Sequence, residues 1–290
     1  MPLVVVAVLV AGLAVTACGG GADEAAIRVE AGGDPEADRI LAAVQAAVAR
    51  APSFRFQFQG VDTTMAYWDD GPRQFTGEGG WSTDGWHLVT RDQDDASETI
   101  LAGDTVYNRW PEPGDPLEGE PWTCWALWED EPLPRDEVLD DMAGTLDEIA
   151  AEGELDDGLV DQLAVALAAG LYLDGTPDRV DWADAEVEVS AFPGDPTSFI
   201  EAIGRGGAAR LLGEAGGVKT LGVTLRAPDD VVAAFGRPIP DGQVELDVGP
   251  DDVPVAMRLH VAGTSDSFDV GVRFSDWGTP VEVAAPAIAC

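Results

Sequence analysis

A single cysteine near the amino terminus carries the clearest chemical signal in this sequence. Cys18 follows Val15, Thr16 and Ala17, which close an uncharged run of apolar and small residues that begins at Leu3. Three glycines follow the cysteine directly. The run is too short to span a bilayer comfortably, and small residues at its end are typical of a cleaved export signal. The pattern is that of a lipobox, in which the cysteine thiol accepts a lipid and the chain is cut just before it.

This pattern predicts that residues 1–17 are a lipoprotein signal peptide and that Cys18 becomes the first residue of an exported protein. Two alternatives remain, an ordinary secretory peptide with a coincidental cysteine and a short anchor helix. No Lys or Arg precedes Cys18, so only the α-amino group supplies the positive charge usual in such signals. Two or more acyl chains on Cys18 would hold the protein stably on the extracytoplasmic face of the cell membrane.

The sequence after Cys18 divides into a tether and a longer part. Residues 18–34 are rich in Gly, Ala and acidic residues and lack apolar periodicity. They predict a flexible tether with a reach of about 20 Å. Residues 35–290 are enough to bury a large core, and we interpret them as one folded domain. No second stretch approaches the ~18 apolar residues that a spanning helix needs.

The formal net charge of −38 constrains the partners. It argues strongly against nucleic acid, because binding there depends on Lys and Arg that neutralise phosphates. It also argues against a basic patch that docks on membranes. We interpret the acidity as a solvated surface that maintains solubility, not as a binding site.

The two cysteines other than Cys18 fit an exported protein. If Cys18 carries lipid, Cys124 and Cys290 remain as a pair in a compartment that permits disulfides. A bridge would hold the last residue against the acidic segment 111–134, and the alternative is two free thiols. This segment contains three tryptophans at three-residue spacing, Trp122, Trp125 and Trp128. They predict either a short helical face or an irregular aromatic cluster.

Apolar residues at three- and four-residue intervals predict helices. The first covers residues 35–51, with Asp34 as its N-cap. Two more are expected around residues 138–149 and 159–171, each with one apolar face. A further short helix is predicted over residues 196–212, although its three glycines disfavour helix.

Alternating apolar and polar residues predict a sheet. Phe54, Phe56 and Phe58 alternate with polar residues, which indicates a strand with one aromatic face. Further strands are predicted near residues 74–81, 85–91 and 98–110. Four alternating segments occupy the last third of the chain, at residues 221–225, 244–248, 255–261 and 268–274. They predict an antiparallel meander with one solvated side, and the helices are the available cover for its apolar side.

The end of the chain resembles a known family. Residues 274–286 read FSDWGTPVEVAAP. This ending is similar to that of the actinobacterial lipoproteins of the LppX/LprG type, which share a LolA-like fold. The order of lipobox, tether, leading helix, aromatic strand, mid-chain helices and terminal meander is similar too. The resemblance implies an α+β fold, in which a strongly curved antiparallel sheet forms an incomplete barrel and helices cover its apolar concave face. It also implies a carrier of lipids, glycolipids or lipidated molecules.

Candidate ligand contacts follow from the alternation. They are the apolar positions predicted to share the concave face, Phe54, Phe56, Phe58, Val255, Leu259, Phe268, Val270 and Phe274. An apolar cavity would gain about 0.8 kcal/mol per buried methylene of an acyl chain. Any half-buried sheet shows the same alternation, so each position has plain core as its alternative. The alternative function is an envelope lipoprotein with a closed core that acts through protein partners as a sensor or assembly factor.

Catalytic and metal-binding motifs are absent from the sequence. It contains no HExxH, no GxSxG and no phosphate-cradling loop followed by Lys. His87 and His260 are the only histidines, too few for a histidine-based metal site unless carboxylates complete it. The acidic clusters around Asp92 and Asp251 do not match an EF-hand loop. We therefore expect no enzyme, no resident metal and no cofactor.

Overall fold

The computed structural model describes most of the chain outside its amino-terminal and central segments. The described residues are 34–63, 72–92, 95–112, 114–126, 207–227, 238–263 and 267–290, with short pieces at 133–134, 143–144, 179–180, 203, 232–233 and 235–236. The signal peptide, Cys18 and the tether up to residue 33 lie outside them. The helices predicted at 138–149 and 159–171 also lie outside them, apart from residues 143–144.

The predicted first helix is confirmed as α2 (Pro35–Val48). Asp34 caps it, and its Oδ1 accepts a hydrogen bond of 3.0 Å from the Glu36 backbone N–H. Its other carboxylate oxygen, Oδ2, accepts from the backbone N–H of Leu211 at 3.4 Å. The cap therefore ties the start of the helix to a strand far away in the sequence. The buried side chains of the helix are Ala37, Ile40, Leu41, Val44 and Val48.

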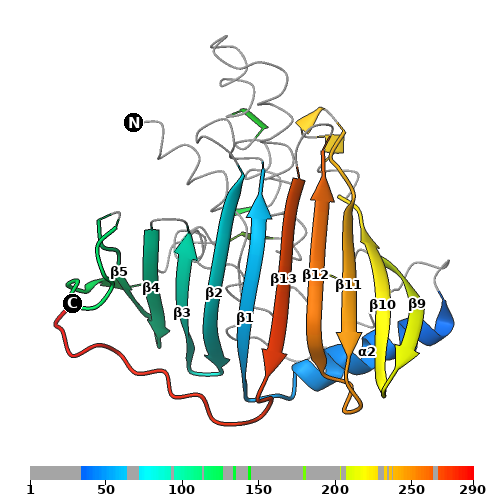
Figure 1. Ribbon diagram of the computed structural model, residues 1–290, viewed down its shortest axis with the longest axis horizontal. Coiled ribbons are helices and arrows are strands. Elements are labelled where there is room, and N and C mark those ends of the chain that lie inside the picture. Colours follow the sequence, from blue (N-terminus) through cyan, green and yellow to red (C-terminus); the bar gives the residue numbers. More distant parts are fainter. Residues whose placement is uncertain are drawn as a thin grey trace.

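Eleven strands of the described residues form one antiparallel sheet, in the order β6-β5-β4-β3-β2-β1-β13-β12-β11-β10-β9 (Figure 1). The strands of the amino-terminal half are β1 (Ser53–Asp62), β2 (Arg73–Ser82), β3 (Gly85–Asp92), β4 (Asp95–Ala102), β5 (Thr105–Arg109) and β6 (Thr123–Ala126). Those of the carboxy-terminal half are β9 (Gly207–Ala215), β10 (Val218–Leu225), β11 (Gly242–Val248), β12 (Pro254–Ala262) and β13 (Ser267–Ser275). A separate pair joins β7 (Leu133–Pro134) to β8 (Arg179–Val180).

The predicted carboxy-terminal meander is confirmed. Strands β10, β11, β12 and β13 follow one another in space as in sequence, each antiparallel to the next. Strand β13 then pairs with β1, and this joins the two halves of the chain in the middle of the sheet.

Three elements differ from the prediction. The segment 98–110 is not one strand, because Gly103, with φ of 66°, makes the turn between β4 and β5. The helix predicted over residues 196–212 is wrong from Gly207 onward, where β9 begins and pairs with β10. Its glycines disfavour a helix, whereas pairing with β10 satisfies the backbone N–H and C=O groups of this segment. The helical alternative for the tryptophan segment is also wrong at residues 123–126, which form β6.

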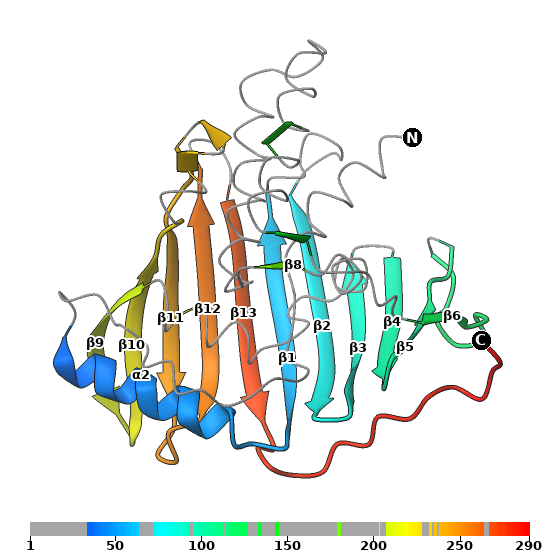
Figure 2. The same ribbon diagram turned by 180° about the vertical axis from the view of Figure 1, so that it is seen from behind.

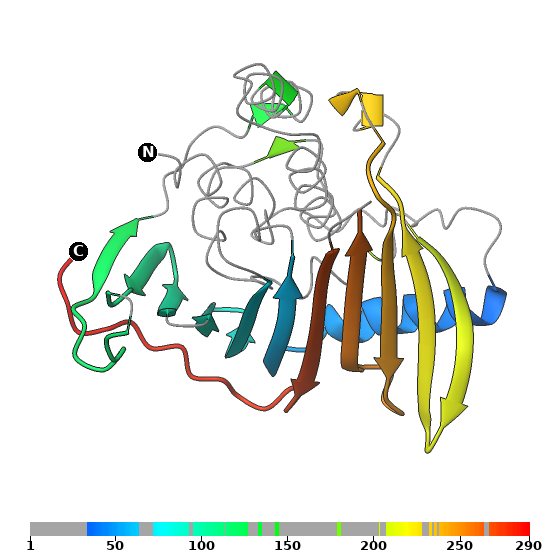
Figure 3. The same ribbon diagram turned by 45° about the horizontal axis from the view of Figure 1, so that its top comes forward.

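The two faces of the sheet differ in character. We call the face that carries the buried core the inner face; α2 lies across it over β9 to β12 (Figures 1 and 2). The opposite, outer face carries exposed ion pairs such as Arg258 with Glu245, 2.8 Å apart. The single apolar side predicted for the meander is therefore confirmed. The sheet is curved and does not close, with β6 and β9 as its edge strands (Figure 3).

Candidate ligand-binding face

The structure places most of the predicted contact residues together on the inner face. Six of them are buried in one core cluster: Phe54, Phe56, Phe58, Leu259, Val270 and Phe274. None of the six is more than 6% exposed. Phe268 is half-buried and packs against the same cluster. These residues come from β1, β12 and β13, which are adjacent in the sheet, so the face is continuous across the junction of its two halves.

Val255 is the exception, because a β-bulge interrupts the alternation that selected it. Asp247 of β11 pairs with Ala256, but the next residue, Val248, pairs with Pro254. Val255 is therefore the extra residue of the bulge, and the inward-facing parity shifts at this point. Pro254 is buried in its place, and Val255 is half-buried and does not belong to the core cluster of the described residues.

A continuous series of aromatic rings runs along β1 and its neighbours. The ring centroids are 6.2 Å apart for Phe54 and Phe56, 6.5 Å for Phe56 and Phe58, and 6.1 Å for Phe58 and Phe75. Phe75 in turn stacks on Phe268 at 5.9 Å. Such spacings are within the range of favourable ring contacts. Sequence reasoning missed Phe75. The available signal is that Phe75 and Trp81 occupy the same set of alternating positions in β2 as Gly77 and Gly79.

A second aromatic cluster closes one end of the inner face. Trp81 stacks on Phe54 with ring centroids 5.4 Å apart, and the Trp277 ring lies tilted to Phe54 with centroids 4.5 Å apart. Phe274 contacts both Phe54, at 6.0 Å, and Trp277, at 5.8 Å. The Trp277 Nε1–H donates a hydrogen bond of 2.8 Å to the backbone carbonyl of Pro254. The rings of Phe54 and Phe274 are thus held by packing among aromatic side chains.

Polar side chains interrupt the inner face over β3, β4 and β5. The hydroxyl oxygens of Thr90 and Ser97 lie 2.5 Å apart, in a hydrogen bond. The Asn108 side-chain amide donates a hydrogen bond of 3.0 Å to the Thr99 hydroxyl oxygen. Ser97 and Thr99 are buried. The register places these four side chains beside Phe58, Gly77 and Leu88, so hydroxyl and amide groups adjoin the aromatic series.

The predicted acidic cluster near Asp92 contains ion pairs. Asp92 pairs with Arg73, and Glu98 accepts from His87 at 2.7 Å and from Arg109. The Arg109 guanidinium also lies over the Trp122 ring, 4.8 Å from its centroid. Within the described part of the chain, no group of three or more His, Cys, Asp or Glu side chains is placed to hold a metal ion.

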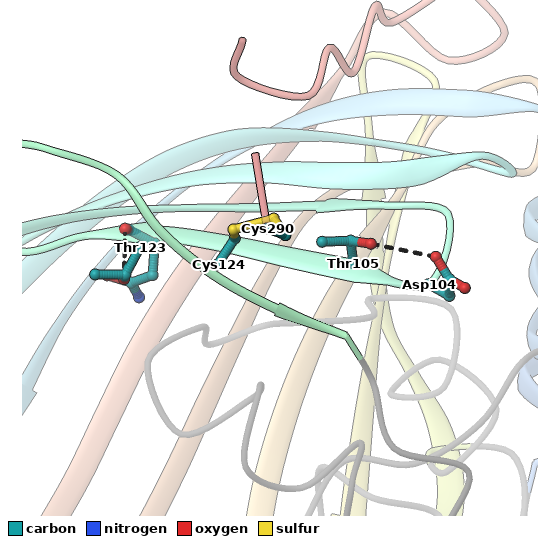
Figure 4. Close-up of a disulfide and its surroundings, with 6 residues drawn as sticks. Asp104, Thr105, Thr123, Cys124 and Cys290 are labelled. Atoms are coloured by element: carbon teal, nitrogen blue, oxygen red, sulfur yellow. Dashed lines mark hydrogen bonds between the residues drawn. A yellow bond between two sulfur atoms is a disulfide. The ribbon is translucent and has the colours of Figure 1, made fainter. Parts of the chain in front are cut away.

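The predicted bridge between Cys124 and Cys290 is present (Figure 4). Their Cα atoms are 5.6 Å apart. The bridge fixes the end of residues 276–290, which we call the C-terminal strap, to edge strand β6. The strap runs past the end of β1 and β2 on its way (Figures 1 and 2). Near its start, the Gly278 N–H donates to the Ser53 carbonyl at 2.8 Å and the Ser53 hydroxyl donates to the Thr279 carbonyl at 2.7 Å.

No helix in the described residues combines the length and the apolar character that crossing a membrane requires. No protein-family model matches the chain, and no curated protein sequence matches it.

Three solved structures that align with the chain are a mycobacterial protein, a mycobacterial lipoprotein and a LolA superfamily protein. LprF from Mycobacterium bovis aligns with a TM-score of 0.42 and 14% identity, over 88% of this chain and 99% of its own. The lipoprotein LppX from Mycobacterium tuberculosis aligns with a TM-score of 0.39 and 12% identity, over 87% of this chain and 100% of its own. A LolA superfamily protein from Nitrosomonas europaea aligns with a TM-score of 0.24 and 9% identity, over 83% of this chain and 91% of its own. LppX belongs to the lipoprotein type that residues 274–286 resemble.

Proposed function

We propose that the protein is a lipoprotein that binds or transfers a lipid, glycolipid or lipidated molecule in the cell envelope. Acyl chains on Cys18 anchor it to the extracytoplasmic face of the cell membrane. It acts by binding and carries out no catalysis. Its direct partners are the membrane and the cargo, and protein partners in the envelope would receive or supply that cargo.

The observation that carries this proposal is the extent of the inner face. The apolar core cluster draws side chains from every strand from β10 through β13 and β1 to β3, with β2 supplying the half-buried Phe75 and Trp81. A hydrocarbon chain that enters such an environment gains about 0.8 kcal/mol for each methylene removed from water. The polar side chains on β3 to β5 adjoin this surface and supply hydrogen-bonding groups for the polar end of an amphiphile. Binding of this kind needs burial and no covalent step.

The anchor supports the same proposal. A protein that exchanges lipid with a bilayer must work at its surface, and a lipidated Cys18 with a flexible tether of residues 18–34 places it there. Cell fractionation tests this part directly. The protein with its own Cys18 should sediment with membranes, and the Cys18→Ser variant should move to the soluble fraction. A Cys18→Ser variant that stays with the membrane would rule out the lipid anchor.

Lipid uptake tests the binding part. The full chain carrying Cys18→Ser is incubated with vesicles of dipalmitoyl phosphatidylglycerol that contain a radiolabelled tracer of the same lipid. Gel filtration then separates protein from vesicles. Label that elutes with the monomeric protein supports the proposal. A protein peak without label, from a correctly folded preparation, contradicts it and favours an envelope lipoprotein that acts through protein partners.

A further inference from the structure

The last residue of the tether, Asp34, is bound to the β9 edge of the sheet. Its backbone N–H donates a hydrogen bond of 3.2 Å to the Ala209 carbonyl, and its side chain accepts one of 3.4 Å from the Leu211 N–H. Helix α2 begins at the next residue, beyond the β9 edge (Figures 1 and 2). The chain that leads back to Cys18 therefore starts from this side of the molecule.

The length of the tether limits how far this edge can lie from the membrane. Cys18 precedes Asp34 by 16 positions, and a Gly-rich coil of that length reaches about 20 Å. Neighbouring strands are about 4.8 Å apart, so β9 and β6, at the two edges of the eleven-stranded sheet, are separated by about 48 Å along its curved surface. An acylated Cys18 therefore brings the β9 edge closer to the bilayer than the β6 edge.

The two edges also differ in charge. The segment 207–227, which contains β9, β10 and their turn, has three basic residues, Arg210, Lys219 and Arg226, and one acidic residue. Its formal charge is +2, a local excess that the net charge of the chain, −38, conceals. At the opposite edge, residues 110–122 between β5 and β6 have four acidic residues and no basic one. An anionic bilayer attracts the first edge and repels the second.

An exposed apolar side chain lies near Arg210 in β9. Leu212 has no paired residue in the β9–β10 register, which shifts at a bulge between Thr220 and Leu221. A Cβ built on Gly222 would lie 3.1 Å from each Cδ atom of Leu212, so the leucine side chain lies across β10. It is 45% exposed. Apolar side chains next to basic ones are typical of surfaces that bind at the membrane interface.

We propose that the β9–β10 hairpin, residues 207–225, is the surface that contacts an anionic bilayer when Cys18 is anchored. This inference rests on the lipid anchor of the proposed function and adds the side from which the protein meets the membrane. In this orientation Arg210 and Lys219 contact headgroup phosphates, and Leu212 enters the interface. The β6 edge, with the disulfide and the C-terminal strap, points away from the bilayer.

Fluorescence quenching by a headgroup-labelled lipid measures which edge lies at the membrane. The full chain with acylated Cys18 is reconstituted in vesicles of phosphatidylglycerol and phosphatidylcholine, and part of the phosphatidylcholine carries a nitroxide on its headgroup. The label is attached to Leu212→Cys or, as the matched control, to Trp110→Cys; both positions are exposed. Because Cys124 and Cys290 are bridged, the introduced thiol is the reactive one. The label at position 212 should be quenched several-fold more strongly than the label at position 110.

Neutralising the basic residues tests the electrostatic part of the proposal. Arg210→Gln combined with Lys219→Gln should weaken the docked orientation by about fivefold for each basic residue removed, and quenching at position 212 should fall with it. Replacing the phosphatidylglycerol with phosphatidylcholine should have the same effect. The control is Arg55→Gln on β1, in the middle of the sheet, which should leave quenching unchanged.

The outcomes separate this inference from the anchor on which it rests. Equal quenching of the two labels, or stronger quenching at position 110, in a chain that stays on the vesicles overturns the orientation and leaves the anchor intact. A chain that has its own Cys18 and does not associate with the vesicles overturns both. Unchanged quenching at position 212 after both basic residues are neutralised overturns the hairpin as a headgroup-binding surface.

Discussion

The two halves of the sheet, on either side of the β1–β13 pair, are built differently. The inner face of β9 to β12 is filled by branched aliphatic side chains such as Leu221, Val223, Val244 and Leu246, and α2 packs on it. The inner face of β1 to β6 carries phenylalanine rings over glycines and then a group of hydroxyl and amide side chains. The first half is an ordinary helix-on-sheet core. The second combines aromatic rings, glycines and hydrogen-bonded polar side chains.

The halves also differ in how they are secured. In the aliphatic half, Asp34 ties the start of α2 to β9 through both a backbone and a side-chain contact. In the aromatic half the C-terminal strap and the Cys124–Cys290 bridge hold edge strand β6. The difference indicates that one half is stabilised mainly by burial and the other also by a covalent link. Four substitutions test this contrast.

Cys290→Ser should have the largest effect on stability. The bridge joins residues 166 positions apart, and removing a link that closes so long a loop costs about 4–5 kcal/mol in the chain-entropy account. Denaturant unfolding under oxidising conditions measures it. The double variant Cys124→Ser/Cys290→Ser serves as the control and should match the single variant. A single variant as stable as the parent would show that the strap is not needed to hold β6.

Leu246→Ala should destabilise the aliphatic half by about 2–5 kcal/mol, because its fully buried side chain leaves a cavity. Lipid uptake per folded molecule should fall less than in Phe58→Ala, because Leu246 lies on β11, outside the strands of the predicted contact residues, β1, β12 and β13. Urea unfolding and vesicle uptake, measured on the same preparation, give both quantities. A fall in uptake as large as that of Phe58→Ala would erase the functional distinction between the halves.

Thr99→Val should cost about 1–3 kcal/mol, because it keeps the side-chain shape but removes the acceptor of the Asn108 amide. The matched control is Thr224→Val on β10, whose hydroxyl donates to Gln243 in an exposed position. That variant should be nearly neutral. Equal losses of unfolding free energy in the two variants would show that the hydroxyl and amide side chains on β3 to β5 stabilise the fold no more than an exposed hydrogen bond does.

Arg258→Gln should have the smallest effect, about 0–1 kcal/mol. Its ion pair with Glu245 is exposed on the outer face, where water screens the attraction. Thermal unfolding at low and at high salt is the measurement, and the small difference from the parent should shrink further at high salt. A loss above about 2 kcal/mol would mean that the outer face contributes to stability as strongly as the inner face does.

The elements with a regular period were predictable from the sequence. Helix α2 and strands β1 and β10 to β13 carry one apolar face each, and local period and burial agree there. The Cys124–Cys290 pairing followed from the assignment of Cys18 as the lipidated residue. Strand β9 was not predictable in this way, because pairing with β10 decides its conformation and local composition does not.

The candidate site was predictable in its aromatic strand but not in the strand register that sets glycines opposite the rings. Parity selected Phe56, Phe58 and Val270 correctly as inward-facing, and it failed at Val255, because a bulge depends on pairing with β11 that no local pattern reveals. Gly60, Gly77 and Gly79 acquire their meaning only through the register that sets each opposite a ring. A glycine in one strand gives no sign of which side chain leans over it.

The central claim is that the inner face carries lipid, and native mass spectrometry tests it most directly. The full chain with Cys18→Ser is purified from a host with a cell envelope, without added lipid, and sprayed under non-denaturing conditions. The account predicts a protein mass increased by that of a defined lipid, which is lost on denaturation. A single mass of the bare chain, unchanged after incubation with vesicles, would contradict it.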